Sequence, residues 1–172
     1  DPYAKTDWDA AAPFKDLVAP NYYSFNLGKI HYVVLDNINY INSGGSQGVV
    51  GDRNYKGVIL QDQMDWLKKD LATIKDKSTP IVVAMHIPLF KRPVLDDNGQ
   101  QISDLRLDNG NELINLLNEF ENVRILSGHS HKNNTAEPTS NLMEHNTAAI
   151  CATWWWTRKP GYSDNHICTD GS

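Results

Sequence analysis

Two short apolar runs in this sequence end at histidines, with a helix-forming stretch between them. Residues 80–85 are typical of a strand buried in a parallel sheet, and His86 ends the run. The second run, residues 123–127, stops just before His129 and His131. A strand–helix–strand order predicts a right-handed crossover between parallel strands, whose carboxyl ends meet at one edge of the sheet. We therefore expect the three histidines to approach each other there, one or two strand spacings of about 4.8 Å apart.

Apolar periodicity predicts the remaining elements of an α/β fold. The sequence favours a hairpin of two strands, one helix before each histidine-terminated strand, and a further strand near the carboxyl end. In chain order these segments are 22–27 and 30–35 for the hairpin, 61–74 and 109–120 for the helices, and 147–153 for the last strand. Asn109 is expected to cap the second helix, with Glu112 as its capping-box partner. The polar stretches 1–21, 42–57 and 89–108 are expected to be loops.

Three neutral imidazoles at one crevice suit zinc, iron or manganese. Each of the other three histidines is expected to be an ordinary polar residue with local partners. His31 lies inside an apolar strand, His145 in a polar loop and His166 in the carboxyl-terminal tail. The residues alone leave two interpretations open. The three strand-end histidines either hold half of a two-metal catalytic site or bind one structural zinc ion without catalysis.

Charge and length narrow the class of protein. A net charge of −5 on 172 residues, with no basic stripe, argues against nucleic acid as a stable partner. No apolar stretch approaches the roughly 20 residues that a membrane-spanning helix needs. The chain begins at Asp1 without a start methionine or signal peptide and stops at Ser172. Both ends are therefore expected to be cuts in a longer polypeptide, so that the remainder of that polypeptide is a partner of this chain.

The carboxyl-terminal segment holds features with two interpretations each. Cys151 and Cys168 are either a buried thiol and a loop thiol, or a disulfide that would require an oxidising compartment. The run Trp154–Trp156 is either a hydrophobic seam against a neighbouring domain or part of an interaction surface. We expect one domain over residues 1–153 and an exit segment over 154–172.

The segments around the three strand-end histidines resemble motifs of the calcineurin-like metallophosphoesterases. The resemblance runs through about residues 20–155, and the pair of histidine motifs is its most specific part. The matching segments are Met85-His86-Ile87-Pro88, Gly128-His129-Ser130-His131, Tyr22-Tyr23-Ser24-Phe25, the run from Gly28 to Asp36, and Gln63 to Asp70. It implies part of a four-layer αββα sandwich, with mixed sheets and flanking helices.

The first three metal motifs of that family do not occur ahead of His86, where the family has them. They are Asp-x-His, a Gly-Asp-x-x-Asp-like motif and Gly-Asn-His-Asp/Glu, and Gly51-Asp52 is a poor imitation in the wrong order. The resemblance therefore implies the C-terminal portion of a phosphoesterase domain. His86 and His129 would bind one metal ion and His131 the other. No catalytic residue is expected in this chain, since the acid histidine would lie upstream.

The implied activity is hydrolysis of a phosphorylated substrate, a phosphomonoester or a phosphodiester, by two-metal hydroxide attack. Its cofactors would be two divalent or trivalent ions of zinc, manganese or iron. The chain alone is expected to be inactive or nearly so. The segment from Ile167 to Gly171 resembles the one that leads to a following β domain in some bacterial members, which weakly favours a periplasmic or secreted parent protein.

Overall fold

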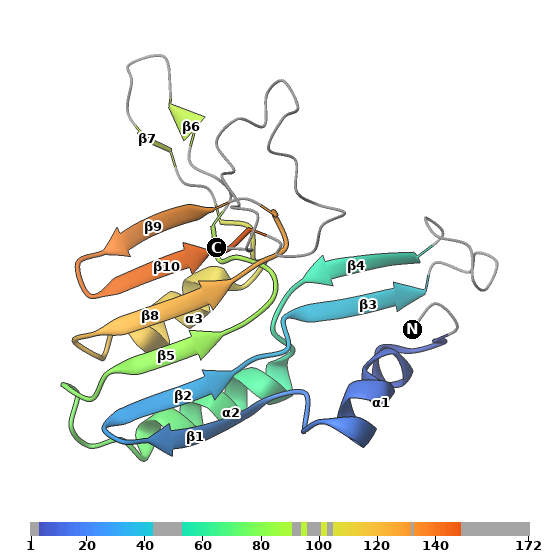
Figure 1. The fold of residues 1–172 in the computed structure, drawn as a ribbon, viewed down its shortest axis with the longest axis horizontal. Helices are drawn as coiled ribbons and strands as arrows, with labels where there is room; N and C mark the ends of the chain where they lie inside the picture. The colour runs from blue at the N-terminus through green and yellow to red at the C-terminus, as the bar shows by residue number, and fades with distance from the viewer. Residues whose placement is uncertain are drawn as a thin grey trace, which may run out of the picture.

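The chain forms a six-stranded mixed sheet with two helices against one face (Figure 1). The computed structural model describes residues 4–42, 53–90, 94–95, 101–102, 105–131 and 133–148. From one edge to the other, the strands are β1 (Tyr23–Leu27), β2 (Ile30–Val34), β5 (Ile81–Ala84), β8 (Val123–Ser127), β10 (Leu142–Asn146) and β9 (Asn134–Thr139). The helices are α1 (Asp7–Leu17), α2 (Gln61–Ala72) and α3 (Gly110–Leu117).

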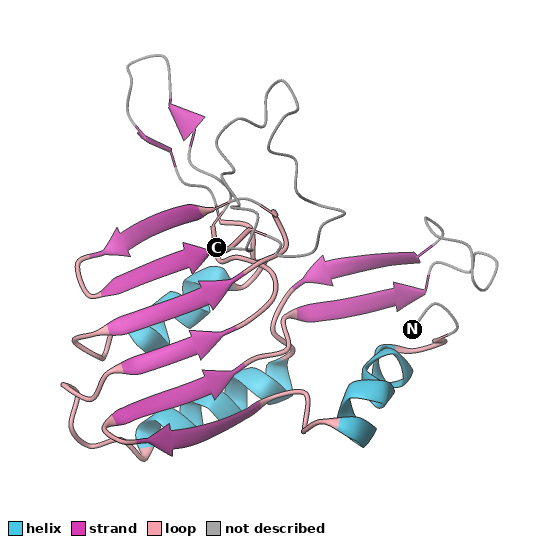
Figure 2. Cartoon of the chain, in the orientation of Figure 1, coloured by secondary structure: helices cyan, strands magenta, loops and turns pink. Residues whose placement is uncertain are grey.

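Two short hairpins lie outside that sheet (Figure 2). One pairs β3 (Ile38–Asn42) with β4 (Arg53–Gly57), and the other pairs β6 (Val94–Leu95) with β7 (Gln101–Ile102). Among the described residues, no helix is long and apolar enough to cross a membrane.

The two histidine-terminated strands are parallel neighbours in the sheet, as their order in the sequence predicts. Ile81 of β5 pairs with Val123 of β8, and Ala84 pairs with Leu126. The expected hairpin is also confirmed, because β1 and β2 pair antiparallel. In this register β5 and β8 end at the same edge, so the residues that follow them start from neighbouring positions.

One face of the sheet is buried against α2 and α3, and it forms the core. Alternate residues of each strand point to this face, which is the period-2 pattern of a half-buried strand. The cluster joins Val33, Ile81, Val83, Val123 and Ile125 of the strands to Met64, Leu67, Leu71, Leu113 and Leu117 of the helices. Lys68 of α2 and Glu112 of α3 form an ion pair of 2.8 Å that links the two helices.

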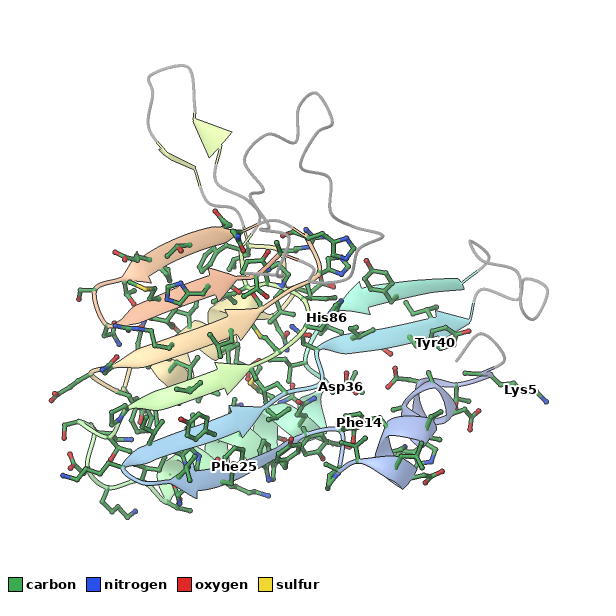
Figure 3. All side chains as sticks on the ribbon, in the orientation of Figure 1. Lys5, Phe14, Phe25, Asp36, Tyr40 and His86 are labelled. Atoms are coloured by element: carbon green, nitrogen blue, oxygen red, sulfur yellow. The ribbon has the colours of Figure 1, made fainter. Side chains whose placement is uncertain are left out.

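The opposite face carries apolar side chains, and no helix lies over it in Figure 2. Phe25 and Leu126 are each 44% exposed there, and Phe25 stacks on Tyr32 with ring centroids 5.0 Å apart (Figure 3). We call this surface the open sheet face; it comprises Tyr23, Phe25, Leu27, Tyr32, Val34, Val82, Ala84, Arg124, Leu126, Met143 and His145. Residues 30–35 are nearly all apolar, which predicts burial on both faces, but this prediction is wrong because only alternate residues of β2 are buried.

Several expectations about local structure are wrong. The stretch 1–21, expected as loop, contains α1, whose N-cap Thr6 accepts a hydrogen bond from the Asp9 backbone N–H at 3.1 Å. The stretch 42–57, expected as loop, contains β4, and the stretch 89–108, also expected as loop, contains the short strands β6 and β7. Neither β9 nor β10 was expected; β9 is an edge strand that includes Pro138, which only an edge or a bulge tolerates.

The expected last strand over 147–153 is not found where it can be checked. Residues 147–148 follow β10 as irregular chain, and 149–153 lie outside the described residues. The domain boundary at residue 153 also lies outside them.

Asn109 stands at the start of α3 but makes no capping hydrogen bond. Its amide instead pairs with the backbone of Ile59, donating to the carbonyl at 2.8 Å and accepting from the N–H at 3.1 Å. Glu112 pairs with Lys68. The expected capping box is therefore wrong, because both side chains hold neighbouring segments of the fold instead.

Candidate metal centre

The structure brings His86 and His129 into contact at the carboxyl edge of the sheet. His86 follows β5 and His129 follows β8 (Figure 3 labels His86). Nε2 of His86 lies 3.2 Å from Nδ1 of His129, and the two rings meet edge to face at a centroid distance of 5.1 Å. His131 is close enough for its charge to influence the pKa of both rings. The strand-end placement thus brings His86 and His129 together; the role of His86, His129 and His131 as metal ligands stays a prediction.

The loop that carries His129 and His131 has an unusual backbone. His129 has a φ of 65° and His131 a φ of 55°, in the left-handed region that non-glycine residues seldom occupy. The Ser130 N–H donates to the Gly128 carbonyl at 2.7 Å, which closes a tight turn around His129. The Gly128 N–H donates to the His86 carbonyl at 3.0 Å and joins the two histidine loops directly. Such strained conformations persist only where surrounding contacts impose them.

Both contacting imidazoles are held in their neutral form at neutral pH. Burial, followed by the positive charge of Arg106, lowers the pKa of His129 to about 4. Burial, followed by the neighbouring His131, lowers the pKa of His86. A neutral imidazole keeps the lone pair that a metal ion requires. The site is therefore prepared to bind a cation without first losing protons.

The spacing of the two nitrogens fits two ligands of one ion. Tetrahedral zinc with Zn–N bonds of 2.0–2.1 Å separates two ligand nitrogens by about 3.3 Å, close to the 3.2 Å observed. Within the described ranges, no three histidine, cysteine, aspartate or glutamate side chains gather closely enough to hold an ion. Two neighbouring imidazole nitrogens are therefore what the described residues offer to an ion, with no carboxylate gathered beside them.

Tyr55 of β4 is a site residue that sequence analysis missed. Its hydroxyl lies 3.0 Å from Nε2 of His129, and its ring meets the imidazole edge at 5.7 Å. If Nε2–H of His129 donates to the Tyr55 hydroxyl, the lone pair of His129 is on Nδ1, the nitrogen that faces His86. The sequence signal available was the alternating stretch from Ile38 to Ile41, which pairs with β4 and places Tyr40 opposite Tyr55.

We expect Tyr55→Phe to weaken zinc binding in a protein that contains the complete metal site. The substitution keeps the ring contact and removes only the hydroxyl that orients His129. Loss of an outer hydrogen-bond partner of a metal-binding histidine costs about 10- to 100-fold in affinity, and the lower end applies here because Tyr55 is half exposed. Zinc titration by competition with a chromogenic chelator measures the effect. Tyr40→Phe, on the neighbouring strand, is the control, and an equal loss in both variants would contradict the assignment.

A hollow of about 400 Å³ opens beside His86, at the carboxyl ends of β2, β5 and β8. Val34, Ala84 and Leu126 of the open sheet face line it, together with Gly128 of the second histidine loop. The candidate site thus lies at a corner between the sheet edge and the open sheet face, where a ligand can reach the histidines.

The other histidines have the local partners expected of ordinary polar residues where they can be checked. His31 is buried, with Nε2 2.8 Å from a carboxylate oxygen of Asp70 and Nδ1 2.9 Å from the Asn26 side chain. His145 lies on strand β10, not in a loop as expected, and Nδ1 is 3.4 Å from the Thr135 hydroxyl. His166 lies outside the described residues, as do Cys151, Cys168 and Trp154–Trp156.

Comparisons with known proteins identify relatives in structure only. No protein-family model and no curated protein matches the sequence. A dimetal phosphatase from Danio rerio is similar in structure, with 13% sequence identity and a TM-score of 0.50, over 74% of this chain and 49% of that one. A structure of PhoD has 17% identity and a TM-score of 0.51, over 76% of this chain and 29% of that one.

At these identities the likeness concerns the fold. The chain has a mixed α/β fold like that of part of these two structures. It spans about half the length of the first structure and less than a third of the second.

Proposed function

We propose that this chain is the C-terminal portion of a calcineurin-like metallophosphoesterase domain, a metal-dependent phosphatase or phosphodiesterase when complete. The observation that carries the proposal is the 3.2 Å separation of two neutral imidazole nitrogens at the sheet's carboxyl edge. The similarity to a dimetal phosphatase supports it through the fold. His86 and His129 would hold one ion through Nε2 and Nδ1, and His131 would hold a second.

In this reaction the residues of this chain would bind the metal ions and set the spacing of their ligands. Two bound ions clamp a phosphate and lower the pKa of a water molecule, which can then attack phosphorus. His86 and His129 supply neutral nitrogens from two neighbouring strands, so that the spacing of those strands sets the spacing of the ligands. Zinc, manganese or iron each suit histidine ligands, and no residue described here selects among them.

In this proposal the chain holds only part of the metal site. Three imidazoles carry no negative charge to balance two dications, and the aspartate-containing motifs of the family do not occur ahead of His86 in this sequence. The open sheet face is apolar and broad, as expected of a sheet that packs on a second sheet in a four-layer αββα sandwich. We propose that the preceding part of the polypeptide supplies both the missing ligands and that second sheet.

Comparing this chain with a longer protein that includes the preceding residues tests the proposal. We expect the longer protein to bind two metal ions and to hydrolyse p-nitrophenyl phosphate or bis(p-nitrophenyl) phosphate. The 172-residue chain should bind zinc weakly and show almost no turnover. Turnover by this chain at about 10 s⁻¹, a usual enzyme rate, would contradict its incompleteness. Zinc that stabilises the longer protein without any hydrolysis would instead indicate the alternative, a structural zinc module with three histidine ligands.

A further inference from the structure

Strand β10 places two buried polar side chains in the core face of the sheet. Glu144 is 2% exposed and Asn146 is 4% exposed. Burial raises the pKa of the Glu144 carboxyl, which shows that its environment opposes the charge. A buried polar side chain is tolerated when hydrogen bonds satisfy it, so the partners of these two residues indicate their role.

Glu144 connects the loop after His86 to the end of strand β8. One carboxylate oxygen accepts hydrogen bonds from the Leu89 N–H and from the Ser127 hydroxyl, both at 2.8 Å. The other accepts from the Phe90 N–H at 3.2 Å. Leu89 belongs to the segment that leaves His86, and Ser127 is two residues before His129. A single side chain therefore fixes the distance between the two histidine loops.

Asn146 forms hydrogen bonds to the His129 loop itself. Its amide group donates to the Ser127 hydroxyl at 3.1 Å and to the Gly128 carbonyl, and its oxygen accepts from the Ser130 hydroxyl. These contacts lie on both sides of His129, the first of the two residues with positive φ. They supply the restraint that such a backbone conformation needs.

We infer that Glu144 and Asn146 are positioning residues that hold His86 and His129 in contact. The Ser127 hydroxyl links Glu144 to Asn146. Ser127 donates to Glu144 and accepts from Asn146, so the three side chains form one buried chain of hydrogen bonds. Asn37 adds a second grip on the His86 loop, since its amide pairs with the backbone of Ile87 at 2.6 and 3.0 Å. Only the consequence for metal binding rests on the proposed function.

Nuclear magnetic resonance of the metal-free 172-residue chain tests the positioning directly. In the unmodified chain, nuclear Overhauser effects should connect the ring protons of His86 and His129. Asn146→Ala should remove these effects while the amides of β5 and β8 keep their protection from hydrogen exchange. The matched control is Asn141→Ala at the opposite end of β10, which removes one hydrogen bond to the Phe120 carbonyl and should leave the ring contact intact.

The same variants in the longer protein report the functional consequence. We expect Asn146→Ala to lower zinc affinity by about 10- to 100-fold, the usual cost of losing an outer partner of a metal site, and Asn141→Ala to leave it unchanged. Ring contact that survives in Asn146→Ala, or is missing from the unmodified chain, would overturn the inference. If Asn146→Ala does not fold, Ser127→Ala decides in the same way, because it deletes only the central hydroxyl. A longer protein that never binds metal would refute the proposed function. The positioning role would still be supported if Asn146→Ala loses the ring contact in that protein.

Discussion

Replacing His129 with alanine should lower hydrolysis by about 10³-fold or more in a protein that combines this chain with the missing upstream motifs. The imidazole would bind one of two ions, and losing that ion removes the clamp on the attacking and leaving oxygens. The stability cost should be small, because His129 lies past the end of β8 and is only partly buried. Hydrolysis rate, bound metal and melting temperature, measured on one preparation, separate these effects.

The matched control is His145→Ala. His145 lies on β10 of the same sheet, with its Nδ1 3.4 Å from the Thr135 hydroxyl. This variant should keep both metal ions and its activity. A His129→Ala protein with two ions and unchanged hydrolysis would show that His129 takes no part in the site. A variant that unfolds would show that His129 serves the fold rather than the chemistry.

A charge at the centre of the open sheet face should cost little stability in the 172-residue chain and much more in the longer protein. Leu126→Asp in the 172-residue chain should change the free energy of unfolding by about 1 kcal/mol or less, since Leu126 is 44% exposed there. In the longer protein a second sheet should cover this position. A buried, unpaired carboxylate would then cost several kcal/mol. Urea denaturation of both proteins, with and without the substitution, measures the difference.

Leu60→Asp is the control for exposure. Leu60 is also 44% exposed, but it stands at the N-cap of α2, away from the sheet, where aspartate is a favourable residue. It should leave both proteins as stable as before. Equal tolerance of Leu126→Asp in the long and short proteins would show that nothing packs on the open sheet face, which contradicts the sandwich.

The sequence determined the order of the central strands and the placement of the histidines at their ends. Residues 80–85 and 123–127 are apolar runs around an amphipathic helix, and such a unit has one common topology. Because parallel neighbours end at the same edge, the loops that carry His86 and His129 start from neighbouring positions. This information is local and periodic, and for that reason it can be read from one sequence.

Only the tertiary structure revealed the contacts that surround the histidines. Tyr55 lies in β4, which pairs with β3. Its role depends on its contact with His129, which is far away in the sequence. Glu144 and Asn146 belong to β10, which its polar composition concealed, and their burial follows from the pairing of β10 with β8. Periodicity encodes which face of an element is apolar, whereas the partner of a polar side chain is decided by which distant segments pack beside it. The sequence therefore specified where the candidate metal site lies, and the packing of distant strands decided what holds it in place.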